Sequence, residues 1–417
     1  MNIVFINHFA GIPKKNETSL RHYYIAKELE KNGFNCSIIT SSKSYQTENK
    51  INNREEVINN IKYFFVDEYD TITNNLFTKF LRMFSFSYSL YWYLLFNKTK
   101  QKPDYVFSSS PDLMTCFVAY YFAKRNSAKF IFEIRDIWPL SQEVLHGYSK
   151  LHPVVLLFRR IEKFLHKKSS LVVSNLPNYE KYIVDNNLDC KKYIYAPQII
   201  DFDFYKKNYF SDEDLSFEHN HIFKKYDNIG IYSGTIGSYY GIKHMINALI
   251  HYNKKSNNEN NFALILMGDG DRKDYALKMK EQYDLSNLYI LDAQTKSYLL
   301  NIHKKCSFGI VSFPDKKLYK YGIASLKMFD YLYSGLPILM LGPFNKYSIL
   351  KDSQFPFHSN FGDINQMCIE FDKLCSLGSN KKELIKDEYR SLLIKNATIN
   401  SCSDIISELT DNYNISS

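Results

Sequence analysis

Two glycine-containing turns in the second half of the chain carry the residue types that bind phosphate groups. The first reads Tyr232-Ser233-Gly234-Thr235-Ile236-Gly237 and stands between an apolar strand pattern and a helix pattern. Glycine lets backbone N–H groups approach an anion, and the start of a helix adds positive potential. The pattern predicts a diphosphate site at Gly234, Thr235 and Gly237, although a plain strand-to-helix turn has the same composition.

The second turn, Met267-Gly268-Asp269-Gly270-Asp271, also follows an apolar strand pattern. It places flexible backbone at the carboxyl edge of the same predicted sheet, where open α/β sheets bind ligands. Gly268 and Gly270 are therefore further candidates for the diphosphate site. The alternative is an ordinary turn in which Asp271 caps the next helix.

A lysine near the start of a predicted helix is the third feature that indicates an anion. The helix pattern begins at about Ser325, so that Lys327 lies in the first turn and Asp330 follows three residues later. A cation at this place opposes the helix dipole, and a bound anion would remove the conflict. Asp330 is suited to accept a sugar or ribose hydroxyl. A surface Lys–Asp pair is the structural alternative.

Charged residues also end one predicted strand of the first half. Glu133, Arg135 and Asp136 come at this strand end with Trp138 close behind. Charged groups at such an edge are costly unless they are paired or functional. They are candidates for a site, and an Arg135–Asp136 ion pair is the alternative. We expect His8, at the end of the first strand pattern, to be a packed residue rather than a catalyst.

The elements that would position these residues alternate along the chain. Short apolar runs rich in β-branched residues alternate with longer helix patterns, which predicts parallel sheets covered by helices on both faces. Strands are expected at 3–8, 36–40, 63–66, 105–109, 130–134, 171–174, 193–196, 229–233, 262–267, 289–291, 309–312 and 337–341. Helices are expected at 19–32, 242–252, 272–283, 297–306 and 325–334.

The alternation restarts after about residue 205, and 417 residues are too many for one typical core. We therefore expect two Rossmann-like α/β domains that face each other across a cleft, at 1–205 and 228–390. A polar linker or surface excursion is expected at 206–227. A C-terminal helix within 391–417 is expected to pack back on the first domain.

Composition narrows the class of protein. The formal net charge of +9 is compatible with phosphate, nucleic acid or anionic lipid, and nothing resembles a nucleic-acid module. The seven Cys are scattered without a CxxC pair, which argues against a zinc site or disulfides and for the cytoplasm. No secretory signal is expected at the N-terminus, and no G-x-G-x-x-G follows the first strand, which counts against a nicotinamide or flavin dehydrogenase.

Two segments combine aromatic and basic residues in a way that suits a membrane interface. Residues 74–102 contain no acidic residue and have an uncharged aromatic run at 84–96, which is too short to span a bilayer. Residues 153–168 carry apolar and basic side chains together. Both segments are candidates for contact with the inner face of the cytoplasmic membrane, and two core-packing helices with solvated basic edges are the alternative.

Taken together, these motifs resemble the family 4 retaining glycosyltransferases, which have the GT-B fold. The helix beginning at Arg21 and the strand after it resemble the opening pattern of that family. Ser110-Pro111, the stretch Glu133 to Pro139 and the stretch Tyr321 to Asp330 resemble one branch. That branch contains transferases of fucosamine type from bacterial O-antigen and capsule synthesis.

The resemblance implies a nucleotide-sugar donor in the second domain and a lipid-linked glycan acceptor in the first. The expected donor residues are Gly234, Thr235, Gly237, Gly268, Gly270, Tyr321, Gly322, Ser325 and Lys327. The expected catalytic residues are Asp136, Glu133 and Asp330, of which Asp330 would hold the ribose. The expected acceptor contacts are Arg21, Arg135 and Trp138. We expect a UDP-linked deoxy- or N-acetylamino sugar, retention of configuration, and no metal or other cofactor.

The sequence departs from the family at three places. Gly322 stands where the family has the first acidic residue of a pair, the loop after the first strand lacks the second of two glycines, and Gln198 to Asp201 replaces an Asn-Gly-x-Asp motif. Two other functions therefore stay open. One is a non-hydrolysing sugar-nucleotide epimerase, and the other is a catalytically silent partner in a polysaccharide-assembly complex.

Overall fold

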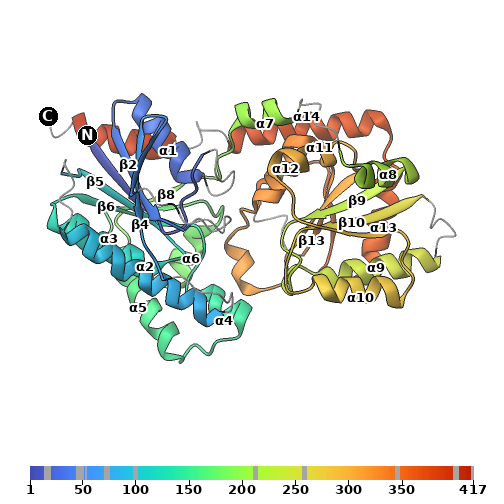
Figure 1. Ribbon diagram of the computed structural model, residues 1–417, viewed down its shortest axis with the longest axis horizontal. Coiled ribbons are helices and arrows are strands. Elements are labelled where there is room, and N and C mark those ends of the chain that lie inside the picture. The colour runs from blue at the N-terminus through green and yellow to red at the C-terminus, as the bar shows by residue number, and fades with distance from the viewer. Residues whose placement is uncertain are drawn as a thin grey trace. The chain divides into compact units, whose positions relative to one another are not determined.

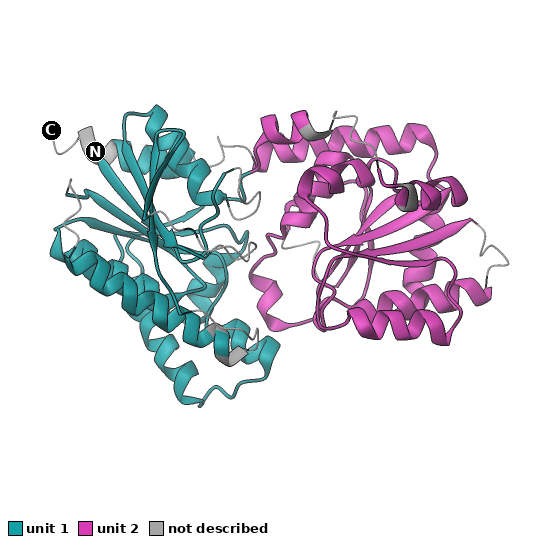
Figure 2. Cartoon of the chain, in the orientation of Figure 1, with its two compact units in different colours: residues 1–199, 399–417 teal, residues 200–398 magenta. Residues whose placement is uncertain are grey.

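The chain forms two compact α/β units in the computed structural model (Figures 1 and 2). Unit 1 comprises residues 1–199 and 399–417, and unit 2 comprises residues 200–398. The structure describes the whole chain except residues 14–19, 44–50, 52–53, 70–75, 97–101, 210–214, 256–260, 343–347, 398–402 and 415–417. Both ends of the first segment expected at the membrane, 74–75 and 97–101, and part of the expected linker, 210–214, thus lie outside the described residues, whereas the second segment, 153–168, is described in full.

Unit 1 is built on an eight-stranded sheet in the order β3-β4-β2-β1-β5-β6-β7-β8. All neighbouring strands are parallel except β3 and β4. The strands are β1 (Asn2–Ile6), β2 (Asn35–Ser41), β3 (Glu55–Ile58), β4 (Ile61–Val66), β5 (Tyr105–Ser109), β6 (Lys129–Ile134), β7 (Leu171–Ser174) and β8 (Tyr193–Tyr195). The order reverses between β1 and β5, where open sheets of this kind place ligands.

Helices cover both faces of this sheet. They are α1 (Arg21–Lys31), α2 (Leu76–Phe96), α3 (Leu113–Arg125), α4 (Leu140–His146), α5 (Pro153–Lys168), α6 (Tyr179–Asp185) and α15 (Ser403–Asn414). In Figure 1, α2, α3 and α5 lie together on one side of the sheet, and α1 lies on the other. Ile405 and Leu409 of α15 share the core cluster that contains Leu29 of α1, so the C-terminal helix belongs to unit 1.

Unit 2 has a fully parallel six-stranded sheet in the order β11-β10-β9-β12-β13-β14. Its strands are β9 (Asn228–Ser233), β10 (Phe262–Met267), β11 (Leu288–Leu291), β12 (Phe308–Ser312), β13 (Ile338–Leu341) and β14 (Phe357–Ser359). β9 is central and almost wholly buried, so the turn that follows it emerges at the middle of the carboxyl edge.

The helices of unit 2 also form two layers. They are α7 (Phe202–Tyr209), α8 (Phe217–Lys225), α9 (Ile242–Lys255), α10 (Lys273–Gln282), α11 (Lys296–His303), α12 (Leu326–Ser334), α13 (Ile364–Cys375) and α14 (Ser379–Asn396), with 3₁₀ turns at Lys317–Tyr321 and Ile349–Asp352. Figure 1 shows α9 and α10 on one side of the sheet and α7, α11, α12 and α14 on the other.

The boundaries between the units differ from those expected from the sequence. The division falls at residue 199, and residues 206–227 hold the end of α7 and the whole of α8 instead of a linker. Tyr205 of α7 and Ile222 of α8 lie in the core cluster of unit 2, which is why these two helices pack on that unit. Similarly, α14 extends to Asn396 within unit 2.

Candidate functional site

The turn after β9 and the first turn of α12 meet at the carboxyl edge of unit 2. A Cβ atom placed on Gly234 would lie 2.9 Å from Nζ of Lys327 and 3.1 Å from its Cε. Gly234 has a φ of +134°, which L side chains rarely adopt. The residue is therefore glycine both for its conformation and for the close approach of the Lys327 side chain.

The Lys327 amino group packs on aromatic rings. It lies 3.9 Å from the ring centre of Tyr232 and 5.1 Å from that of Tyr240. Among the residues that the structure describes, no carboxylate pairs with it. Burial lowers the pKa of Lys327 to about 7. The favourable contact with the two rings offsets only part of the lost hydration, so an anionic ligand would supply the missing counter-charge.

The two glycine turns pack against each other through their backbones. The N–H of Gly234 donates to the carbonyl of Met267, and the N–H of Ile236 donates to the carbonyl of Asp269, each at 2.9 Å. A Cβ on Gly268 would lie 2.0 Å from the carbonyl oxygen of Gly234, and one on Gly270 would lie 2.5 Å from that of Ile236. Gly268 and Gly270 thus support the first turn by close packing.

Two N–H groups of the first turn remain available to a ligand. Within the described ranges, the backbone N–H groups of Thr235 and Gly237 have no protein acceptor. Because Gly234 and Ile236 are tied to the neighbouring turn, the alternate residues are left to bind an anion beside Lys327.

Asp271 has a different role from the helix cap expected in the alternative interpretation. The N-cap residue of α10 is Arg272, without a side-chain hydrogen bond. The Asp271 carboxylate instead accepts hydrogen bonds from the N–H of Ser238, at 3.1 Å, and from its hydroxyl. That carboxylate therefore joins the two glycine turns rather than starting a helix.

The residues just before α12 set the backbone conformation at the start of that helix. Ser325 occupies the N-cap position, as expected, but its hydroxyl makes no capping bond. Gly322 has a φ of +124°, and Tyr321 is buried. The first N–H groups of an α-helix lack intrahelical acceptors, so this uncapped start is a further donor for an anion next to Lys327.

Asp330 lies one turn further along α12 and has partners that the sequence pattern did not indicate. Its carboxylate accepts a hydrogen bond from the hydroxyl of Tyr205 and lies 3.2 Å from Nζ of Lys296. The Lys296 amino group in turn lies 4.6 Å from the ring centre of Tyr205. Tyr205 is 125 positions away from Asp330, and only the fold brings the two together.

In unit 1, Glu133 at the end of β6 is enclosed by polar partners. Nε of Arg21 lies 2.6 Å from its carboxylate, the Ser109 hydroxyl donates to it at 2.8 Å, and Nε2 of His22 lies 3.2 Å away. Burial opposes the charge, but Arg21 and His22 outweigh it and hold the pKa of Glu133 well below its ordinary value. The geometry favours a positioning role for Glu133 and Arg21, because this pair fixes the start of α1 on the sheet.

Arg135, Asp136 and Trp138 follow Glu133 at the same edge. The hydroxyl of Ser110 accepts the backbone N–H groups of Arg135 and Asp136, at 2.9 and 3.0 Å. Nε of Arg135 is buried and has no hydrogen-bond partner in the described part of the chain. The Asp136 side chain is exposed. Arg135 and Asp136 thus stay candidates for a ligand site at this edge.

Trp138 lies on the helices of unit 1. Its ring centre is 5.6 Å from that of Phe80 on α2 and 5.6 Å from that of Phe158 on α5. The ring is half-buried. Trp138 thus connects the edge that carries Arg135 and Asp136 with the layer of α2 and α5.

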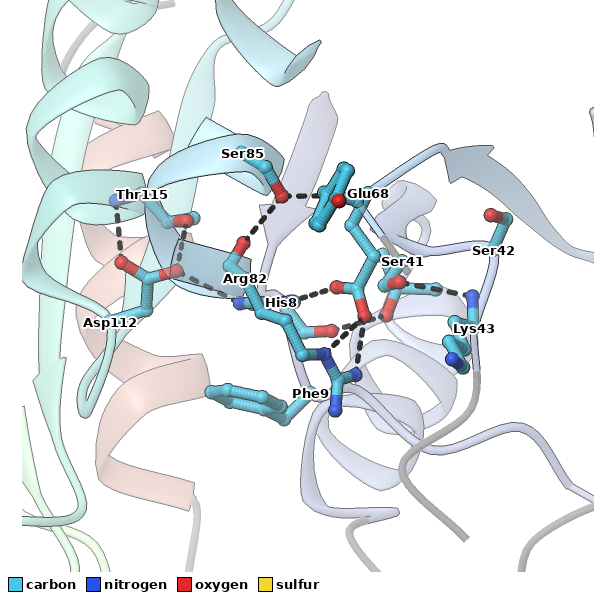
Figure 3. A network of polar contacts seen from close by, with 12 residues as sticks. His8, Phe9, Ser41, Ser42, Lys43, Glu68, Arg82, Ser85, Asp112 and Thr115 are labelled. Carbon is cyan, nitrogen blue, oxygen red and sulfur yellow. Dashed lines mark hydrogen bonds and ion pairs between the residues drawn. The ribbon is translucent and has the colours of Figure 1, made fainter. Parts of the chain in front are cut away.

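Figure 3 shows a second buried network at the end of β1, which the sequence did not reveal. Both ring nitrogens of His8 contact carboxylates: Nδ1 lies 2.9 Å from Asp112, and Nε2 contacts Glu68. Burial alone would lower the pKa of His8, but the two carboxylates raise it. Nε of Arg82 on α2 donates to Glu68 at 2.8 Å. His8 is packed, as expected, and the network ties α2 and the start of α3 to the sheet.

Comparison with known proteins identifies the fold. No family model matches the sequence, and no curated protein matches it. Solved structures match over nearly the whole chain. The sucrose-phosphate synthase of Thermosynechococcus elongatus is 11% identical, with a TM-score of 0.73 and 100% of both chains covered.

Two further matches have comparable extents. An α,α-trehalose-phosphate synthase (UDP-forming) from Burkholderia xenovorans, in complex with glucose-6-phosphate, is 11% identical with a TM-score of 0.71, covering 98% of this chain and 100% of the other. Anabaena HepE in complex with UDP is 11% identical with a TM-score of 0.66, covering 99% and 100%. The chain therefore has the GT-B fold, as the sequence predicted.

Proposed function

We propose that this protein is a glycosyltransferase that takes a sugar from a nucleoside diphosphate sugar. The observation that carries the proposal is the Lys327 amino group, which packs against Gly234 and Tyr232 without a carboxylate partner among the described residues. Support also comes from the solved structures with this fold, one of which is a complex with UDP.

The proposed donor site uses the backbone of one turn and one lysine. The diphosphate accepts hydrogen bonds from the backbone N–H groups of Thr235 and Gly237. Gly268 and Gly270 pack against the turn that contains these two residues. Lys327 and the start of α12, with Ser325, Gly322 and Tyr321 before it, neutralise the leaving diphosphate. Asp330 accepts the ribose hydroxyls. None of these steps needs a metal ion.

The proposed acceptor site lies at the carboxyl edge of unit 1. Asp136 contacts the reacting sugar, and Arg135 and Trp138 bind the acceptor, while Glu133 and Arg21 hold the edge in place. We propose a lipid-linked glycan as acceptor, with a UDP-linked deoxy- or N-acetylamino sugar as donor and retention of configuration. We propose that the protein acts in O-antigen or capsule synthesis, at the inner face of the cytoplasmic membrane. No described helix is long and apolar enough to span a bilayer.

Calorimetric titration with UDP, GDP and dTDP tests the donor site. We expect UDP to bind, and Lys327→Met to weaken binding about 10- to 100-fold, since a hydrogen bond to a charged group contributes about 1.5–3 kcal/mol. Lys278→Met is the matched control, because Lys278 is an exposed lysine of α10 in the same unit. Equal affinity of wild type and Lys327→Met would refute the site.

A transfer assay separates this function from the alternatives. With purified UDP-sugars and a lipid-linked acceptor, we expect sugar transfer that requires the acceptor. Conversion of the UDP-sugar without any acceptor would instead identify an epimerase. Failure to bind any nucleotide would favour a catalytically silent partner.

A further inference from the structure

Helix α2 of unit 1 is apolar on two opposite faces. One face packs inward through Met83, Phe86, Leu90 and Leu94, all of which are buried. The opposite face exposes large side chains at helical spacing, namely Leu81, Phe84, Tyr88, Tyr91, Trp92 and Phe96. Tyr88 is 66% exposed and Phe96 is 73% exposed. A continuous apolar stripe of this kind on a surface indicates an interaction site.

The exposed rings contact one another along the helix. The ring centre of Trp92 lies 6.1 Å from Tyr88, 5.4 Å from Tyr91 and 5.4 Å from Phe96. These side chains thus form one contiguous aromatic surface and not a set of isolated exposed residues. The neighbouring helices also expose large side chains, namely Tyr121 of α3 and Leu156 and Leu157 of α5.

The same three helices account for most of the excess of positive over negative charge in the protein. They lie side by side, as their packing and Figure 1 show. Together α2, α3 and α5 contain nine Lys and Arg and one acidic residue, Glu162, which is buried. The whole chain has 53 Lys and Arg against 44 Asp and Glu, so the rest of the molecule is nearly neutral. Exposed cations of this layer are Lys124, Arg125, Arg160, Lys163, Lys167 and Lys168.

We propose that the outer face of α2, α3 and α5, hereafter the α2–α3–α5 face, docks on a bilayer that contains anionic lipid. Tyr, Trp and Phe favour the headgroup region, where an apolar ring and a polar edge are both satisfied. Lys and Arg around them are attracted to the negative surface potential. A protein partner would have to supply acidic groups over three helices, whereas an anionic bilayer supplies them over any area.

The hydrogen-bond network around His8 holds α2 in place on unit 1. Glu68 accepts hydrogen bonds from Arg82, so α2 is held on the sheet by an ion pair below its aromatic stripe. A helix that is already folded and anchored loses little conformational entropy when it meets a bilayer. The inference stands on the surface of unit 1 and needs no part of the nucleotide site.

Vesicle flotation of the full chain tests the proposal. We expect the protein to float with vesicles of phosphatidylcholine and phosphatidylglycerol at low salt, and to stay in solution with pure phosphatidylcholine or in 0.5 M NaCl. The aromatic variant Tyr88→Ser/Trp92→Ser/Phe96→Ser should lower the bound fraction at least about tenfold, because three inserted rings are lost. The charge variant Arg160→Gln/Lys163→Gln/Lys167→Gln should lower it about as much.

Matched controls come from exposed residues of unit 2. Leu277→Ser/Tyr283→Ser/Leu384→Ser removes three exposed apolar side chains, and Lys224→Gln/Lys278→Gln/Lys381→Gln removes three exposed cations. We expect neither to change flotation. Bound vesicles should also shift the tryptophan emission to the blue in wild type, and Trp92→Phe should abolish this shift.

Three results would overturn the proposal. The first is a protein that does not float with anionic vesicles, and the second is flotation that the control variants reduce as much as the test variants. The third is a lipid-free dimer in light scattering that dissociates in the aromatic variant, since a second copy would then cover the face. UDP titration of the same samples is a separate readout, so that loss of lipid binding and loss of nucleotide binding are distinguished.

Discussion

At the residue scale, the charge state of Lys327 is the property on which the donor site depends. Its amino group lies on two tyrosine rings, and burial lowers its pKa to about 7. A lysine with a lowered pKa is neutral in part of the molecules at neutral pH, and a diphosphate beside it favours the charged form. Binding of the nucleotide is therefore expected to take up a proton.

This linkage gives a pH dependence with a definite sign. Below pH 7 Lys327 is already charged, whereas above pH 7 it must be protonated on binding, so the affinity for UDP should fall as pH rises, by up to about tenfold per unit. Calorimetry at pH 6.5, 7.5 and 8.5 in buffers of different ionisation enthalpy measures both the affinity and the proton uptake. Lys327→Arg stays charged throughout, so its affinity should not change over this range. The same pH profile in both proteins would contradict this account.

At the scale of elements, the turns after β9 and β10 act as one backbone unit. Gly268 meets the carbonyl oxygen of Gly234 so closely that no side chain fits between them. The geometry of the proposed diphosphate site is thus set by the neighbouring turn as well as by its own residues.

We therefore expect Gly268→Ala to distort the proposed donor site indirectly, through its packing against Gly234. The added Cβ would lie 2.0 Å from the Gly234 oxygen, and the φ of +147° strains any L residue, so we expect a loss of more than about 2 kcal/mol in stability together with weaker UDP binding. Thermal unfolding with and without UDP measures both effects. Gly378→Ala is the control, because Gly378 has no atom within 4 Å of an added Cβ. A melting temperature equal to that of the control would argue against the packing described.

The positions of many strands were accessible from the sequence. The buried strands Tyr105–Ser109, Leu171–Ser174 and Phe262–Met267 were predicted to the residue, because a parallel strand covered on both faces is a continuous apolar run. The edge strands β3 and β14 were not predicted. β3 alternates between exposed and half-buried residues, and β14 has only three residues, so neither leaves an apolar run.

Only part of the candidate site could be predicted from the sequence. Strand ends and glycines indicated that Gly234 and Lys327 serve one site, and the structure places them in contact. Tyr205 and Lys296 around Asp330, and Glu68 around His8, were not foreseen, since these contacts join elements far apart in the chain. A local sequence pattern does not show which distant side chain will pair with a buried charged group.

At the scale of the whole molecule, the two units of the GT-B fold carry different candidate sites. Unit 2 carries the glycine turns and Lys327, whereas unit 1 carries the edge with Arg135 and Asp136 and the basic, aromatic α2–α3–α5 face. The net charge of the chain therefore says little about nucleotide binding, which we attribute to one lysine and backbone N–H groups. The net positive charge comes mainly from the α2–α3–α5 face, which we propose to bind lipid.

The most direct test of the donor site is a titration of glycine-selective ¹⁵N-labelled protein with UDP, followed by amide resonances. The chain has 15 glycines, so that each signal can be assigned by substitution. We predict that UDP and inorganic diphosphate shift the signals of Gly234 and Gly237, that uridine shifts them much less, and that Lys327→Met removes the effect of diphosphate. Saturation with UDP that leaves both signals unmoved would contradict the account.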